Sequence, residues 1–121
     1  MNQAQGLYSW FSTIDDIPAY PANSVPNDVM LPYRTYTPVF GDFNSPVSIT
    51  VNCWAYTDSE VVVFNMVKAV VDRAKAQPIY VYDGGAIQFY VDGGWGQDAP
   101  TDISPGLKVK TMNLTAEFLS V

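Results

Sequence analysis

Residues 46–77 have the sequence PVSITVNCWAYTDSEVVVFNMVKAVVDRAKAQ, which predicts a strand that runs directly into a helix. Apolar and polar residues alternate from Val47 to Tyr56, which is the period of a half-buried strand. Thr57 and Glu60 match a capping box at the start of a helix. Apolar residues then recur at helical spacing until Pro78 ends the helix. This unit determines the architecture and contains no catalytic chemistry, which favours a structural or assembly role.

Upstream of this unit, the chain predicts a short helix followed by an extended arm. Apolar residues follow the i, i+3, i+4, i+7 spacing of an amphipathic helix over residues 3–13, namely Leu7, Trp10, Phe11 and Ile14. The segment 17–32 carries four prolines and is expected to lack regular pairing, namely Pro18, Pro21, Pro26 and Pro32. An unstructured stretch of this length in a small domain usually has a function, so the arm is the first place to look for partner contacts.

Further strands are predicted on both sides of the central helix. Residues 33–39 alternate as a strand, and the turn at 41–46 joins it to the strand beginning at Val47 as a hairpin. Two short strands, 79–82 and 86–91, flank Asp83-Gly84-Gly85, where glycine supplies the positive φ of a tight turn. Residues 92–106 are rich in Gly, Asp and Pro and are expected to form a loop.

Residues 107–121 predict a long closing strand whose apolar phase shifts by one residue. Leu107 and Val109 occupy one phase, whereas Met112 and the apolar residues after it occupy the other. Two explanations stay open: a bulge near Lys110-Thr111, which we favour, or a strand that changes its buried face.

These elements predict an α+β fold within a single domain, residues 1–121. The expected sheet is mixed or mainly antiparallel, with about four to five strands, and it packs with a short N-terminal helix and one longer central helix. Along the chain, residues 1–16 hold the first helix, 17–32 the proline-rich arm, and 33–121 the hairpin, central helix and closing strands.

Composition excludes several classes of function. The net charge is −6, from 12 acidic and 6 basic residues, which argues against the clustered Lys and Arg of a nucleic-acid binder. An acidic surface can still let DNA pass without sticking to it. The single cysteine, Cys53, lies on the apolar side of its strand and is expected to be buried. Neither a secretion signal nor a membrane span is evident, so folding in a cytoplasm is expected.

Catalytic, metal and cofactor sites are not predicted. The chain has no histidine, which removes His-based acid–base chemistry and most zinc sites. The acids that could pair as catalytic carboxylates all lie in turns, namely Asp83, Asp92, Asp98 and Asp102. Residues 93–98, GGWGQD, match the start of a calcium-binding repeat, but that motif works by stacking copies and here there is one.

Three stretches carry a resemblance to a known family. They are LPYRTY at 31–36, VSITVNCWAYT at 47–57 and TMNLTAEFL at 111–119. Together they resemble the tail terminator, or tail completion, proteins of long-tailed bacteriophages, over about residues 7–119. The chain departs from that pattern between Ala86 and Asp102, where it has Gly93-Gly94-Trp95.

The resemblance implies a structural protein of the virion, located in the tail and neck and assembled in the host cytoplasm. Such a protein forms a ring, expected to be a hexamer, that caps the tail tube and ends its polymerisation. Its implied partners are other copies of itself, the tail-tube protein and the head-side connector, while DNA passes through the lumen without specific binding. Aromatic residues that are expected to be exposed, together with one arginine, are the expected interface anchors, namely Tyr33, Arg34, Tyr36, Trp54, Tyr56 and Trp95.

Two alternatives remain. Another head–tail joining protein or a tail-tube subunit would share this composition, but a tube subunit should polymerise into filaments instead of stopping at a closed ring. A protein of a different class, a small ligand-binding module, would use Trp54, Tyr56 and Trp95 as a stacking platform. An enzyme ranks last, because every candidate carboxylate has a turn role.

Overall fold

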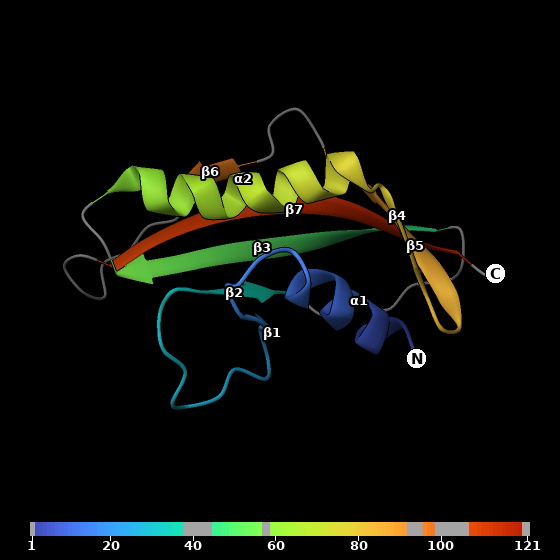
Figure 1. Cartoon of the computed structure of the whole chain (residues 1–121), viewed down its shortest axis with the longest axis horizontal. Coiled ribbons are helices and arrows are strands. Elements are labelled where there is room, and N and C mark those ends of the chain that lie inside the picture. The colour runs from blue at the N-terminus through green and yellow to red at the C-terminus, as the bar shows by residue number, and fades with distance from the viewer. Residues whose placement is uncertain (1, 38–44, 57–58, 92–95, 99–106, 120–121) are drawn as a thin grey trace.

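The computed structural model describes residues 2–37, 45–56, 59–91, 96–98 and 107–119. Within these ranges the chain forms two helices and seven strands around one sheet (Figure 1). In chain order they are α1 (Gln3–Ser12), β1 (Ala19–Pro21), β2 (Tyr33–Tyr36), β3 (Pro46–Tyr56), α2 (Glu60–Ala76), β4 (Ile79–Tyr82), β5 (Gly85–Tyr90), β6 (Gly96–Asp98) and β7 (Leu107–Leu119). The predicted α+β class is confirmed.

The sheet is mixed and larger than the four to five strands expected. Six strands follow the path β1-β2-β3-β7-β5-β4, and β6 pairs with β7 off this path. The β1–β2 pair is parallel, and the other described pairs are antiparallel, including the predicted β2–β3 hairpin. The long closing strand β7 lies inside the sheet, because β3 pairs along one side of it while β5 and β6 pair with different parts of its other side.

The predicted bulge in β7 is wrong. Its register with β3 runs without a break from Pro46↔Glu117 to Tyr56↔Leu107. Residues directly opposite each other in an antiparallel pair share a face, so Val109 lies on the face of Trp54 and Met112 on that of Val51. Both Val109 and Met112 are buried. The other explanation holds: β7 keeps one phase and changes the face on which it buries apolar side chains.

The proline-rich arm contains a strand that was not predicted. Tyr20 of β1 pairs with Thr35 of β2 in parallel, and the flanking bonds run from Arg34 N to Pro18 O at 2.9 Å and from Ala22 N to Tyr36 O at 2.8 Å. This pattern directs the backbone of Tyr20 toward β2 and that of Pro21 toward the free edge. A proline is tolerated there because its missing N–H has no ladder partner to lose. The strand β6 likewise lies within the predicted loop 92–106.

Both helices form close to their predicted positions, but the caps differ from the sequence interpretation. The capping box is at α1, where Asn2 Oδ1 accepts from Gln5 N at 2.8 Å and Gln5 Oε1 accepts from Asn2 N at 3.0 Å. The helix α2 starts after Ser59, whose Oγ accepts from Val61 N at 3.2 Å. Ser59 is therefore the N-cap of α2, and the predicted cap Thr57 lies outside the described residues.

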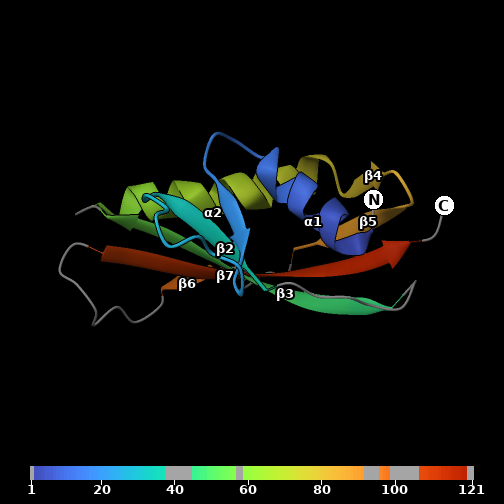
Figure 2. The same cartoon turned by 90° about the horizontal axis from the view of Figure 1, so that it is seen from below.

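One face of the sheet carries both helices (Figure 2). The ring of Trp10 in α1 stacks on Phe89 with centroids 4.0 Å apart, and Phe11 stacks on Tyr36 at 4.3 Å. Gly6 allows α1 to approach closely, since a Cβ there would lie 2.8 Å from the Tyr82 ring. The buried residues of α2 join the same cluster, namely Val63, Met66, Val67, Val70, Val71 and Ala74. Neither helix covers the opposite face, which we call the open face.

Neither described helix is long and apolar enough to cross a membrane.

Candidate functional site

Three aromatic side chains meet on the open face at the β1 end of the sheet. Tyr33 lies opposite Trp54 in the β2–β3 ladder, with ring centroids 6.3 Å apart and planes at 19°. Tyr20 in β1 meets Tyr33 edge-on at 6.1 Å and 69°. These three residues form what we call the aromatic cluster. Aromatic pairs in edge-to-face and offset-stacked arrangements stabilise one another beyond simple area burial.

The position of Trp54 is held by a hydrogen bond within the face. Its indole Nε1 donates to Thr35 Oγ1 at 3.1 Å, and the Trp54 side chain is half-buried. Tyr56, two residues farther along β3, points to the same face and is 68% exposed. The cluster and Tyr56 therefore present aromatic surface of the kind that is enriched at protein interfaces.

A row of hydrogen-bonded polar side chains continues along the open face beside the cluster. Thr50 Oγ1 donates to Asn113 Oδ1 at 3.0 Å, and Thr111 Oγ1 donates to Asn52 Oδ1 at 2.6 Å. Both bonds cross from β3 to β7, and all four groups are uncharged. We call this row the polar ladder. It can exchange hydrogen bonds with a neutral partner, and it offers no nucleophile or acid–base pair.

The open face gathers three of the six predicted interface residues. Tyr33, Trp54 and Tyr56 lie on it, as their alternation along the strands requires. The prediction that Tyr36 is exposed is wrong: it is 2% exposed and lies on the helix-covered face, as does the fully buried Arg34. Both occupy the opposite phase of β2 from Tyr33. Trp95 lies outside the described residues.

Arg34 is the buried member of an ion pair with Asp15, whose side chain is 30% exposed. Its Nη1 donates to Asp15 Oδ1 at 2.7 Å, and its Nη2 donates to Asp15 Oδ2 at 2.8 Å and to the Met66 carbonyl at 2.9 Å. Burial acts to raise the pKa of Asp15, but the hydrogen bonds and charge of Arg34 outweigh it and hold that pKa below its usual value. The contact ties the segment after α1 to both β2 and α2. Its role is therefore structural.

Cys53 is buried beside Arg34 on the helix-covered face, which confirms the sequence prediction. Burial raises the pKa of its thiol to about 11. Because the thiolate is the reactive form, Cys53 is not a candidate nucleophile.

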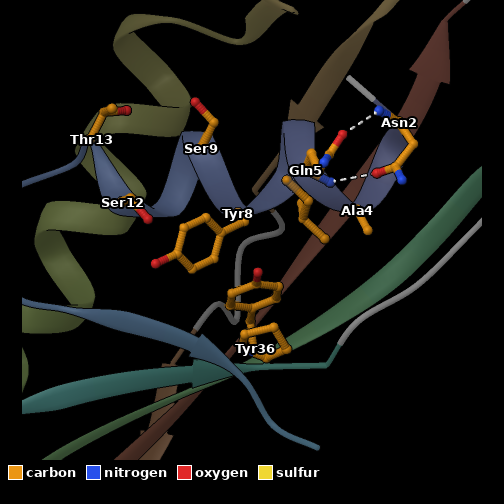
Figure 3. A pocket seen from close by; sticks show the side chains of 10 residues that line it. Asn2, Ala4, Gln5, Tyr8, Ser9, Ser12, Thr13 and Tyr36 are labelled. Atoms are coloured by element: carbon orange, nitrogen blue, oxygen red, sulfur yellow. Dashed lines mark hydrogen bonds between the residues drawn. The ribbon is translucent and has the colours of Figure 1, made fainter. Parts of the chain in front are cut away.

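A cavity of about 690 Å³ lies along α1 on the other side of the sheet. Figure 3 shows Tyr8 extending from α1 toward Tyr36, with the Asn2–Gln5 capping pair at one end. The side chains described as lining it carry no charge, and they are Asn2, Ala4, Gln5, Leu7, Tyr8, Ser9, Ser12, Thr13, Pro21 and Tyr36. Burial, with a smaller contribution from Tyr8, raises the pKa of Tyr36, so the Tyr36 hydroxyl stays neutral at physiological pH. The cavity suits an apolar or neutral polar group.

Sequence reasoning missed Tyr20 and this cavity. Tyr20 lies between two prolines, which masked a three-residue parallel strand. The available signal was the short spacing from Pro18 to Pro21, which is compatible with an edge strand. Nothing in the spacing of Tyr8 and Tyr36 indicates that they approach each other, because α1 and β2 meet through the tertiary fold.

Within the part of the chain that the structure describes, no group of three or more His, Cys, Asp or Glu side chains could hold a metal ion.

Comparison with models of known protein families gives no match for this chain, and comparison with curated protein sequences gives none either.

Proposed function

We propose that the protein is a structural component of a phage virion that assembles into a ring, ends polymerisation of the tail tube and provides the joining surface to the head connector. The observation that carries the proposal is the open face, where the aromatic cluster and the exposed Tyr56 lie on a sheet side that no described helix covers. The sequence resemblance to tail terminator proteins supplies the assembly context.

A ring requires two different complementary patches on each subunit. The open face supplies one, with Tyr56 at its exposed end. The cavity along α1 supplies the other, because it lies toward the opposite side of the sheet and accepts neutral or apolar groups. Two patches on opposite sides of a subunit favour head-to-tail contact over a two-fold pair. The net charge of −6 suits a lumen through which DNA passes without binding.

Light scattering and electron microscopy of the purified protein, alone and with isolated tail tubes, test this function. We expect a closed ring of about six subunits, or capture of the protein at tube ends. Long filaments would instead identify a tail-tube subunit. A monomer at every concentration that tail tubes also fail to capture would contradict the proposal.

The open-face patch is tested by Tyr56→Lys. A lysine placed in an apolar interface must be desolvated, so we expect ring formation or tube capture to weaken by at least tenfold, about 1.4 kcal/mol. Val61→Lys is the matched control, since Val61 is 62% exposed on α2, away from the sheet, and receives the same charge. If both variants weakened ring formation or tube capture equally, or if neither variant did, the open face would not be the interface.

A second candidate function, binding of a small neutral ligand such as a sugar, is favoured by one observation. The near-parallel rings of Tyr33 and Trp54 lie beside the uncharged polar ladder, which together offer stacking and hydrogen bonding. Titration of tryptophan fluorescence with neutral oligosaccharides separates the two functions. A saturable change in a protein that stays monomeric would favour ligand binding.

A further inference from the structure

The strand β4 forms one edge of the sheet, and little in its sequence protects that edge. It reads Ile79-Tyr80-Val81-Tyr82, four residues of high β propensity without a charge or an internal proline. Natural edge strands are usually blunted by charges, prolines or bulges. The opposite edge, β1, is only three residues long and contains Pro21. Of these two edges, β4 is therefore the less protected against pairing with another strand.

The pairing of β4 with β5 determines which backbone groups face outward. Tyr82 lies opposite Gly85 across the tight turn, and Phe89 N donates to Pro78 O at 2.7 Å. Hydrogen-bonding direction alternates along an antiparallel strand, so Pro78, Tyr80 and Tyr82 direct their backbone groups to β5. The N–H and C=O of Ile79 and of Val81 therefore face the free edge.

The side chains of the same two residues are apolar and exposed. Ile79 is 51% exposed and Val81 is 66% exposed, both on the open face. Tyr80 points to the other side, where its hydroxyl meets Ser9 Oγ at 2.6 Å. The edge thus presents two outward amides, two outward carbonyls and two apolar side chains placed symmetrically about Tyr80.

We infer that two copies of this chain pair through β4, as antiparallel strands around a two-fold axis at Tyr80. In this register Ile79 of one copy lies opposite Val81 of the other, and each such pair exchanges two backbone hydrogen bonds. The apolar side chains of both pairs meet on the open face, which removes them from water. The two sheets become one continuous sheet.

Charges agree with this register. Asp83 of one copy comes opposite Gln77 of the other, next to the last turn of α2, which carries Lys75. Opposite charges therefore approach across the axis, and no pair of carboxylates faces itself. The strand β1 is a poorer partner for β4, because Pro21 leaves Ala19 as the outward amide donor in that strand. A second copy of β4 is the occupant that the edge fits best.

This contact does not rest on the ring proposed above. It is isologous, whereas a ring is built from heterologous contacts, so it joins two free subunits or two rings. The two contacts also use different residues, so substitutions can affect them independently.

Cross-linking tests the register directly. Ile79→Cys and Val81→Cys, made as separate variants and mixed under mild oxidation, should give a covalent dimer, because the two thiols lie opposite each other only in mixed pairs. Either variant alone should give much less, and the buried Cys53 provides an unchanged background. Cross-linking of Ile79→Cys alone would overturn this register. An absence of cross-linking in the mixture, with wild-type protein sedimenting without a two-subunit species, would overturn the contact.

A proline substitution tests the role of the backbone. Val81→Pro removes an outward N–H in each copy and leaves pairing with β5 in place, because that N–H points away from β5. Two of the four bonds between copies are lost, so the dissociation constant should rise by about tenfold or more, measured by sedimentation. Val81→Thr, which keeps the N–H and the branched shape, should have a smaller effect. Equal effects of both variants would show that the backbone bonds do not form.

Discussion

At the scale of single residues, Arg34 explains how the N-terminal segment is held to the sheet. Its guanidinium is fully buried, yet Nη1 and Nη2 are satisfied by Asp15 and by the Met66 carbonyl, while Nε has no partner. Asp15 is partly exposed, but a buried charge such as that of Arg34 is costly once its counter-charge is removed. Substitution of Asp15 therefore tests how much this ion pair contributes to stability.

We expect Asp15→Asn to lower the free energy of unfolding by about 2–3 kcal/mol at pH 7, because Arg34 loses its counter-charge. The folded-state pKa of Asp15 is lowered, so its contribution is present above the unfolded pKa, about 4, and is lost as the pH falls through the folded value. The difference in the free energy of unfolding between wild type and variant, measured by urea titration, should therefore shrink below about pH 4.

The matched control is Asp72→Asn, which removes a carboxylate from an exposed pair with Lys68. Its effect should stay below about 0.5 kcal/mol. If the free energy of unfolding differed between wild type and Asp15→Asn by the same amount at pH 7 and at pH 3, the role given to the ion pair would be refuted.

The alternation of a strand indicates which residues share a face but not which face is buried. In β2, Tyr33 and Thr35 alternate with Arg34 and Tyr36, so each side carries one aromatic and one polar residue. Sequence reasoning therefore placed Tyr33 and Tyr36 together as exposed anchors, whereas packing of Phe11 on Tyr36 buries that side. The candidate site was predictable along β3, where one phase is clearly apolar.

At the scale of elements, the helices and five of the seven described strands were predicted because each has strong periodicity. The missed elements are β1 and β6, three residues each, which are too short to show a period. The bulge assigned to β7 has a different cause. Its early residues bury Val109 on the open face beside Trp54, so the apolar phase changes while the register does not. Whether such a phase shift is a bulge or a change of buried face depends on the neighbouring strands, which the sequence does not reveal.

The start of α2 gives a prediction at this scale. Ser59→Ala should lower the free energy of unfolding by about 1 kcal/mol, because Val61 N loses the oxygen that caps it. Thermal or urea unfolding measures this difference. Thr57→Ala serves as the comparison, since the capping box predicted from sequence assigns the larger loss to Thr57. A greater loss for Thr57→Ala would restore that interpretation.

At the scale of the whole molecule, both described helices cover the same side of the sheet, and Cys53 reports on that side. The thiol has no exposed surface and its pKa is raised to about 11, so a disulfide reagent should reach it only when the molecule opens. At pH 8 we expect the native protein to react at least about a thousandfold more slowly than the denatured protein.

Tyr56→Cys provides the internal comparison, since it adds an exposed thiol to the same strand. Two well-separated phases of equal amplitude should appear in its reaction with the reagent. Rapid reaction of Cys53 in the native wild type would contradict the packing of the helices over β3.

The central position of β7 also bears on how the chain reaches its fold. Its partners β3 and β5 both precede it in the chain, yet neither pairs with the other, so the two halves of the sheet stay separate until β7 has been synthesised. The pairing of residues 46–56 with 107–117 closes a long loop, a topology associated with slow folding. During that interval the unpaired sides of β3 and β5 are exposed to other nascent chains, and the risk of misassembly rises with the rate of expression.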